Sequence, residues 1–151
     1  MSDEDEPSEP SRTPLRLVLD FYRLVGKPVR AFPTLSVPGE ETRQLIDLLD
    51  EEIAELKLAL GDDDLLGVAD ALGDIAYVVY GAALQFGIDL DRVLESVHNA
   101  NMSKPNADGT IVRSGEGKIL RGDSYRPPAL RSVLGLDEQP PPTGDRVPPR
   151  E

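Results

Sequence analysis

Two groups of acidic residues carry the chemistry that this sequence could perform. The first group is Glu51, Glu52 and Glu55, and the second is Asp70 and Asp74. Positions three and four apart on a helix are neighbours, so each group shares a helix face if both segments are helical. Two helices packed as a hairpin would bring these five residues, here called the carboxylate cluster, together. Two like charges ~4 Å apart repel by about 4 kcal/mol at an effective dielectric of 20, and a divalent cation is the simplest compensation.

A structural salt bridge is the alternative explanation for the same acids. Glu52 falls near the middle of the apolar stripe of its predicted helix. A carboxylate at such an inward position is costly unless it is paired or binds a metal. Pairing with Lys57 or an arginine would satisfy Glu52, and an ion pair would equally satisfy Asp70 and Asp74. Because the two acidic groups occur together we favour a metal, but both interpretations stay open here.

The composition limits the kind of metal site and the kind of enzyme. The chain has no cysteine and one histidine, His98, so thiolate sites and multi-histidine sites within one chain are excluded. Oxygen ligands suit Mg²⁺, Mn²⁺ or Ca²⁺. A Ser-His-Asp triad has little support, and neither the glycine-rich loop of P-loop enzymes nor an EF-hand loop is present. The remaining chemistry is that of a hard cation with phosphate groups.

The charge distribution supports a phosphate ligand and argues against nucleic acid. The net charge is −12 over 151 residues, which disfavours general nucleic-acid binding. Residues 40–74 hold twelve acids and two bases, whereas residues 98–126 hold five bases and three acids. Ordinary variation of a solvated surface would explain this equally well. The donors that could bind a polyphosphate are Asn101, Lys104, Lys118, Arg121 and Arg126.

Four helices are expected to position these residues. The predicted ranges are 14–25, 38–60, 64–86 and 89–101. Thr13, the triple Asp62-Asp63-Asp64 and Asp89 offer N-caps, and Gly26 and Gly61 stand at C-termini. Residues 110–120 are expected to form a small β-hairpin.

The third predicted helix is the most apolar. Between Leu65 and Phe86 its only charged residues are Asp70 and Asp74, so we expect it to be buried nearly all round. Gly67 and Gly73 weaken such a helix and suggest the close approach of a backbone or a ligand.

The flanking segments differ in composition from this part. Residues 1–13 form an acidic arm and residues 129–151 a proline-rich tail, and both are expected to be disordered, leaving one domain at 14–128. The start of the chain does not resemble a signal peptide. The longest apolar run, 75–84, is shorter than the ~20 residues of a membrane span. We therefore expect a cytoplasmic protein without membrane partners.

The motifs resemble a known superfamily. Glu51-Glu52-x-x-Glu55 and Asp70-Ala-Leu-Gly-Asp74 resemble the EExxE and ExxD helices of the MazG-like, all-α nucleoside triphosphate pyrophosphohydrolases. Its phosphate-binding end is similar to three later stretches, namely His98-x-x-Asn101-Met102-Ser103-Lys104, Asp108-Gly109 and Gly122-Asp123-Ser124-Tyr125. The chain is also similar to the phosphoribosyl-ATP pyrophosphohydrolases. The resemblance covers residues 14–128.

The resemblance implies a fold and a reaction. The fold would be all-α, a four-to-five-helix bundle with the small C-terminal β-hairpin, assembled as a homodimer or a dimer of dimers. The activity would be hydrolysis of a nucleoside triphosphate to the monophosphate and pyrophosphate, with Mg²⁺ as cofactor and Mn²⁺ able to substitute. The chain looks most like the dUTP-hydrolysing, house-cleaning members. The alternatives are phosphoribosyl-ATP, dCTP or a modified nucleotide and, in another class, a non-catalytic helical dimerisation module.

The resemblance also assigns roles to residues. Glu52, Glu55 and Asp74 match metal ligands, and Glu51 matches an acid that orients or deprotonates the attacking water. The acid of the ExxD pattern would fall at Ala71, so Asp70 either substitutes for it or one ligand is missing. The substrate-binding residues would be Asn101, Lys104, Lys118, Arg121 and Tyr125. For the base only an aromatic wall of Phe21, Tyr22 and Phe32 suggests itself, and aromatic residues at such positions are more often core.

Overall fold

The computed structural model describes residues 12–137, and every regular element in this range is a helix. The helices are α1 (Pro14–Val25), α2 (Gly39–Gly61), α3 (Leu65–Gln85), α4 (Leu90–Met102) and α5 (Leu130–Val133). The chain divides into two compact units, one ending at Leu94 and the other beginning at Glu95, and each is described by itself. The all-α prediction is confirmed, and the first four helices begin and end within two residues of the predicted bounds.

Local capping explains why the helices begin where they do. Thr13 accepts a hydrogen bond from the Arg16 amide at 3.4 Å at the start of α1, and Gly26 ends that helix in the left-handed conformation. The Asp64 carboxylate accepts from the Leu66 amide at 3.1 Å at the start of α3. The Asp89 carboxylate does the same for the Arg92 amide at the start of α4, also at 3.1 Å.

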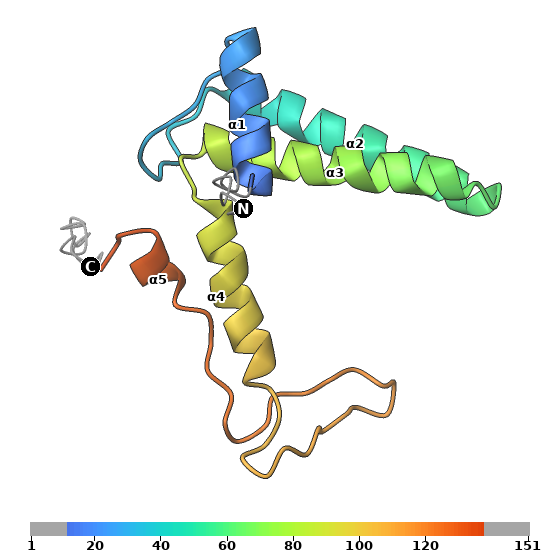
Figure 1. The fold of residues 1–151 in the computed structure, drawn as a ribbon, viewed down its shortest axis with the longest axis vertical. Helices are drawn as coiled ribbons and strands as arrows, with labels where there is room; N and C mark the ends of the chain where they lie inside the picture. Colours follow the sequence, from blue (N-terminus) through green and yellow to red (C-terminus); the bar gives the residue numbers. More distant parts are fainter. Residues whose placement is uncertain (1–11, 138–151) are drawn as a thin grey trace, which may run out of the picture. The chain divides into compact units, whose positions relative to one another are not determined.

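In the first unit, α2 and α3 lie side by side as a long hairpin, and α1 packs on α3 (Figure 1). The buried core lies where α1 meets α3 and consists of Val18, Tyr22, Tyr80 and Leu84. Gly81 allows this close approach, because a side chain there would collide with the Tyr22 hydroxyl. The core is therefore concentrated at one end of the hairpin.

The expectation that α3 is buried nearly all round is wrong. Its buried residues are confined to Ala71 and the segment from Tyr80 to Leu84, whereas Leu65 and Leu66 are 79% and 83% exposed. The reason is that α2 covers one side of α3 and α1 packs against it near its C-terminal end, so the remaining apolar surface has no neighbour in this unit. Of the described helices, α3 alone is long and apolar enough to span a membrane, a pattern that the central helix of a helical protein also shows.

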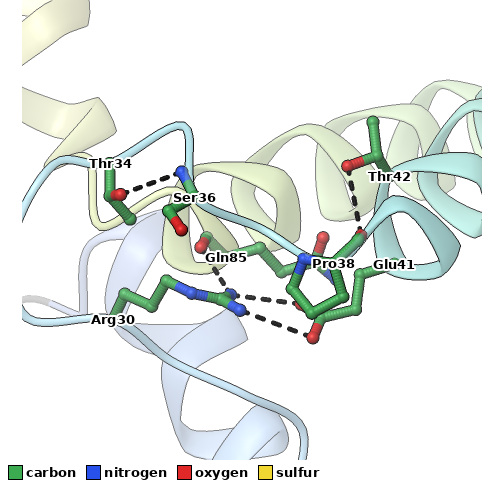
Figure 2. A network of polar contacts seen from close by, with 7 residues as sticks. All are labelled: Arg30, Thr34, Ser36, Pro38, Glu41, Thr42 and Gln85. Carbon is green, nitrogen blue, oxygen red and sulfur yellow. Dashed lines mark hydrogen bonds and ion pairs between the residues drawn. The ribbon is translucent and has the colours of Figure 1, made fainter.

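The loop between α1 and α2 is tied to the C-terminal end of α3 by the Arg30 network (Figure 2). The Arg30 guanidinium donates to the Gln85 carbonyl at 2.7 Å and to both oxygens of Glu41 at 3.1 and 3.4 Å. The amides of Arg30 and Thr34 donate to the carbonyls of Leu84 and Phe86, each at 3.0 Å. These bonds satisfy carbonyls that a helix end otherwise leaves without partners.

The predicted β-hairpin at 110–120 is wrong as a pair of strands. Within residues 12–137 the structure has only an isolated antiparallel bridge between Arg113 and Ile119, closed by the turn 114–117. The apolar side chains that favoured strands, such as Ile111 and Val112, are exposed. A two-stranded ribbon without a packed apolar face is marginal, which explains why the pairing stops at one bridge.

The C-terminal boundary also differs from the prediction. Residues 130–133, which the sequence placed in the proline-rich tail, form the single turn of α5. The amide of Ala129 donates to the Ser96 hydroxyl at 2.9 Å within the second unit. The acidic arm up to residue 11 and the tail from residue 138 lie outside the described residues.

Candidate functional site

The carboxylate cluster is divided between the two helices of the hairpin, as the sequence predicts. Glu51, Glu52 and Glu55 lie on α2, and Asp70 and Asp74 on α3. Glu52 is half-buried, and the other four are exposed. The Oε2 atom of Glu52 is out of contact with water and has no hydrogen-bond partner. Such an orphaned carboxylate oxygen is rare in folded proteins and needs a physical explanation.

The other four acids of the carboxylate cluster all act on the pKa of Glu52. Burial raises the pKa of Glu52 above its ordinary value, and the charges of Glu55, Asp74, Glu51 and Asp70 raise it further, in that order. Burial and neighbouring negative charges both disfavour an ionised carboxyl. The structure therefore makes Glu52 the centre of the cluster and Asp70 its most weakly coupled member.

The salt-bridge alternative finds no support in the structure. Within residues 12–137 the ion pairs are Arg16–Asp20, Arg30–Glu41 and Arg131–Asp137, and none involves the carboxylate cluster. Lys57, the candidate partner of Glu52, forms no ion pair in this part of the chain. Within the described residues, no lysine or arginine side chain compensates the Glu52 carboxylate.

The cluster fits a divalent cation in chemistry, although its side chains do not yet converge on one point. In the described part of the chain, no three acidic or histidine side chains are close enough to hold one ion. The orphaned Glu52 oxygen and the neighbouring carboxylates supply the oxygen donors that Mg²⁺ prefers. Glu55 lies three positions after Glu52 on α2, so its exposed side chain can rotate toward Glu52.

The departure at Ala71 has a structural counterpart. Ala71 is 2% exposed, so it lies on an inward side of α3, whereas Asp70 is exposed. An acid at position 71 would point inward, and the Asp70 carboxylate begins one position further round the helix. Asp70 therefore lies on a different side of α3 from position 71, in agreement with its small contribution to the raised pKa of Glu52.

In the second unit, five predicted substrate-binding residues line one open cavity of about 530 Å³, here called the basic pocket. They are Asn101, Lys104, Lys118, Arg121 and Tyr125. The Arg121 guanidinium lies 4.6 Å from the centre of the Tyr125 ring, which fixes the two side chains relative to each other. Arg126, the remaining candidate, does not line this cavity. The phosphate-binding role of the five residues stays a prediction.

A hydrogen-bonded lock holds the two walls of the basic pocket together. The Ala107 amide donates to the Asp123 carboxylate at 3.0 Å, and the Asp123 amide donates to the Asn106 side chain at 3.1 Å. The Gly122 amide donates to the Lys104 carbonyl at 2.7 Å. The segment that carries Lys104 is thereby fixed to the segment that carries Arg121 and Tyr125.

Sequence analysis missed the residues that support these sites. Asn106 lies in a stretch that the sequence marks only as a turn. Asp123 lies in a stretch that resembles the phosphate-binding end of the superfamily, but the sequence does not show its hydrogen-bond partners. Gln44 and Gln85 lie in helices on a small cavity of the first unit, and helical periodicity carries no signal for them. The suggested aromatic wall is not formed as a unit, because Tyr22 is buried in the core whereas Phe32 is 80% exposed.

A helical hairpin with acids on both arms defines the class of the MazG-like, all-α proteins. The family model "Phosphoribosyl-ATP pyrophosphohydrolase" matches residues 18–101. This match covers more than half of the chain, and the chain belongs to that family.

A curated relative is "Uncharacterized protein L479" of Acanthamoeba polyphaga mimivirus, which is 35% identical over 97 residues. The aligned region covers 61% of this chain and 39% of the viral protein, so this chain matches well under half of the length of that relative.

Proposed function

We propose that this protein hydrolyses a nucleoside triphosphate, dUTP in the first place, to the monophosphate and pyrophosphate, with Mg²⁺ as cofactor and Mn²⁺ able to replace it. The observation that carries the proposal is the Glu52 oxygen, buried without a partner amid four further acids, in a chain of a pyrophosphohydrolase family. A bound divalent cation would neutralise phosphate oxygens and acidify a bound water.

The residues of the chain take distinct roles in this reaction. Glu52, Glu55 and Asp74 would hold the cation, with Asp70 as a more distant carboxylate. Glu51, exposed next to Glu52, would accept the proton of the attacking water. The oxygen of that water forms a bond to the α-phosphorus, the bond from this phosphorus to the oxygen bridging to the β-phosphate breaks, and pyrophosphate leaves.

The basic pocket, taken by itself, would bind phosphate oxygens. Lysine and arginine side chains form strong charge-assisted hydrogen bonds to such oxygens. Asn101 and the Tyr125 hydroxyl would add neutral donors.

Phosphoribosyl-ATP is the second candidate substrate, because the family model that matches the chain takes its name from this reaction. The experiment that separates the candidates is a panel of dUTP, dCTP, the purine triphosphates and phosphoribosyl-ATP, scored for pyrophosphate release with Mg²⁺, with Mn²⁺ and with EDTA. Preference for a nucleotide without uracil would refute the dUTP assignment. Absence of release from every substrate, together with no effect of Mg²⁺ on the melting temperature, would favour a non-catalytic helical dimerisation module.

A further inference from the structure

We propose that the basic pocket binds a whole nucleotide, the base as well as the phosphate, within the second unit alone and without a divalent cation. The inference rests on the proposed function in one respect only, namely that phosphate oxygens bind in this pocket. It does not require hydrolysis at the carboxylate cluster. The described residues that line the pocket lie between Val97 and Pro128, so they all belong to one unit.

The pocket has an apolar part that a phosphate group does not use. The apolar lining residues are Val97, Ala100, Ile119, Leu120 and Pro128. Ile119 and Leu120 are 41% and 39% exposed, so a ligand can still cover them. Pockets for small molecules combine apolar surface of this kind with a few convergent polar groups. The lining therefore predicts a ligand that carries an organic body on its anionic end.

The volume of the pocket leaves room for such a body. A volume of about 530 Å³ corresponds to about eighteen water molecules at roughly 30 Å³ each. It also lies within the range of roughly 300–1,000 Å³ that is common for pockets that bind small molecules. A base and a sugar can therefore enter the pocket together with a phosphate.

The pair of Arg121 and Tyr125 indicates that the organic body is a flat ring. The Arg121 guanidinium lies 4.6 Å from the centre of the Tyr125 ring, so the two side chains form a positively charged stack. Proteins that bind unpaired bases stack them on aromatic rings or on guanidinium planes. A nucleotide base would form the next layer of this stack, on either member of the pair.

Hydrogen bonds fix the segment that carries Tyr125. On its C-terminal side, the Arg126 amide donates to the Ser103 hydroxyl at 2.8 Å, and the Ala129 amide donates to the Ser96 hydroxyl at 2.9 Å. The lock of the basic pocket fixes its N-terminal side. A binding surface that is already ordered loses less conformational entropy when a ligand binds.

The charges of the pocket suit a phosphate that carries no metal ion. In the described part of the chain, the charged lining residues are Lys104, Lys118 and Arg121, and no carboxylate joins them. Within residues 12–137 none of the three forms an ion pair with an acid. Mg²⁺ is usually held by one or two carboxylates besides phosphate oxygens, and this lining supplies none. The three cationic groups can bind the phosphate directly.

Calorimetry with the full-length protein in EDTA tests the inference without turnover. The probes are UMP, AMP, ribose 5-phosphate and inorganic pyrophosphate. UMP and AMP should each bind roughly tenfold more tightly than ribose 5-phosphate, which has the sugar and the phosphate but no base. Replacing EDTA by Mg²⁺ should leave the affinity for UMP unchanged.

Two substitutions of Tyr125 separate the effect of its ring from that of its hydroxyl. Tyr125→Leu removes the ring and should abolish the difference in affinity between UMP and ribose 5-phosphate. Tyr125→Phe keeps the ring and should retain this difference. The matched control is Tyr77→Leu, which removes a tyrosine ring that is 38% exposed in the first unit and should also retain the difference.

Lys118→Gln tests the phosphate end of the ligand. It should weaken the binding of all four probes by roughly threefold to tenfold, because it removes a charged hydrogen-bond donor from a partly solvated site. Lys57→Gln removes the charge of an exposed lysine on α2 and should weaken none of them.

Each outcome decides the matter. Equal affinities of the wild type for UMP and ribose 5-phosphate overturn the inference, as does UMP binding that requires Mg²⁺. A difference that Tyr125→Leu retains or that Tyr77→Leu abolishes overturns it as well. If Tyr125→Leu fails to fold, as its melting curve would show, the wild-type affinities in EDTA and Lys118→Gln decide.

The same measurements separate this inference from the proposed reaction. Pyrophosphate release from dUTP by a protein that binds UMP no better than ribose 5-phosphate would refute the inference alone. Nucleotide binding that depends on Tyr125 and Lys118, in a protein that releases no pyrophosphate from any substrate, would refute the proposed reaction alone.

Discussion

At the scale of single residues, Glu52 is the acid whose ionised form its surroundings disfavour. Its buried oxygen lacks a partner, and burial and four other acids raise its pKa. Two helices rich in carboxylates are common, but an inward-facing carboxylate without a counter-charge is uncommon. The proposed cation and the raised pKa are therefore two aspects of one environment, and a single substitution can test both.

Glu52→Gln should change the pH dependence of stability. Because the pKa of Glu52 is raised in the folded protein, the folded state binds its proton more tightly than the unfolded state. The unfolding free energy therefore falls as pH rises from about 4.5 through the folded pKa. In the metal-free variant this loss disappears, so at neutral pH the variant should be no less stable than the wild type. Urea unfolding between pH 4 and pH 8 measures this.

The same variant should lose any increase in melting temperature that Mg²⁺ gives the wild type, because a ligand stabilises the state that binds it. Asp47→Asn, at an exposed position of α2 outside the cluster, serves as the control and should keep both responses. A large loss of stability in Glu52→Gln, both with and without Mg²⁺, would contradict this account and favour the interpretation of Glu52 as a structural ion-pair partner.

Gly122→Ala should weaken the lock of the basic pocket. A Cβ atom at this position would lie 2.6 Å from the Lys104 carbonyl oxygen and 2.8 Å from the Asn106 amide nitrogen, both backbone atoms. Relief requires a backbone shift, which costs on the order of 1–3 kcal/mol. We expect a lower melting temperature and weaker binding of inorganic pyrophosphate. The matched control is Gly115→Ala, since a Cβ atom there meets nothing within 4 Å. Equal melting temperatures and equal pyrophosphate affinities of the two variants would show that the lock accommodates the added Cβ atom.

Sequence reasoning located the acidic residues but not the hydrogen-bond partners of Gln85 and Asp123. Carboxylates at helical spacing, such as Glu52 and Asp74, can be recognised in the sequence alone. Gln85 and Asp123 act through partners far away in the chain, so their roles appear only when the fold is known. The sequence alone shows that Ala71 departs from the ExxD pattern, and the structure adds that this position is buried.

At the scale of elements, helix bounds were predictable because local signals set them. Thr13, Asp64 and Asp89 cap the helices at the predicted positions. Two of the departures from prediction depend on packing neighbours rather than on local conformational preference. The residues at 110–120 have strand propensity but no surface to pack on, and the apolar residues of α3 exceed what α1 and α2 can cover in their unit.

Gly73→Ala tests whether α3 tolerates a side chain beside the cluster. A Cβ atom at Gly73 meets nothing within 4 Å, so alanine should stabilise the helix by about 0.5–1 kcal/mol through its better helix propensity. Chemical denaturation of the protein at several concentrations measures the change. Gly67→Ala is the comparison, because its Cβ atom would lie 2.7 Å from an Asp64 carboxylate oxygen and 3.0 Å from the Ala59 side chain. A loss of stability at Gly73 would mean that another surface approaches this position.

At the scale of the whole molecule, the homodimer stays a prediction, and the exposed apolar residues of the hairpin offer a candidate surface for it. Leu58 and Leu66 lie near the turn of the α2–α3 hairpin and are 68% and 83% exposed. Contiguous exposed apolar surface is characteristic of association sites. We propose that a second copy of the chain covers this surface, as the resemblance to dimeric pyrophosphohydrolases suggests.

Leu66→Lys should shift the protein toward the monomer, because a charge at this position would have to be desolvated in the interface. Light scattering across a concentration series should show a dissociation constant raised at least tenfold. Leu35→Lys places the same charge on a 91% exposed loop leucine and should leave the association unchanged. A monomeric wild type, or a Leu66→Lys dimer as tight as the wild type, would contradict the proposal.

The Arg30 network of Figure 2 has a consequence for limited digestion with trypsin. The bond after Lys27 precedes Pro28 and resists that protease, so Arg30 provides the cleavable bond of the loop between α1 and α2. A guanidinium held by Glu41 and the Gln85 carbonyl cannot enter a protease pocket until those bonds break. Cleavage there would follow the population of the opened loop. The rate of tryptic cleavage after Arg30 therefore reports how often the loop between α1 and α2 opens.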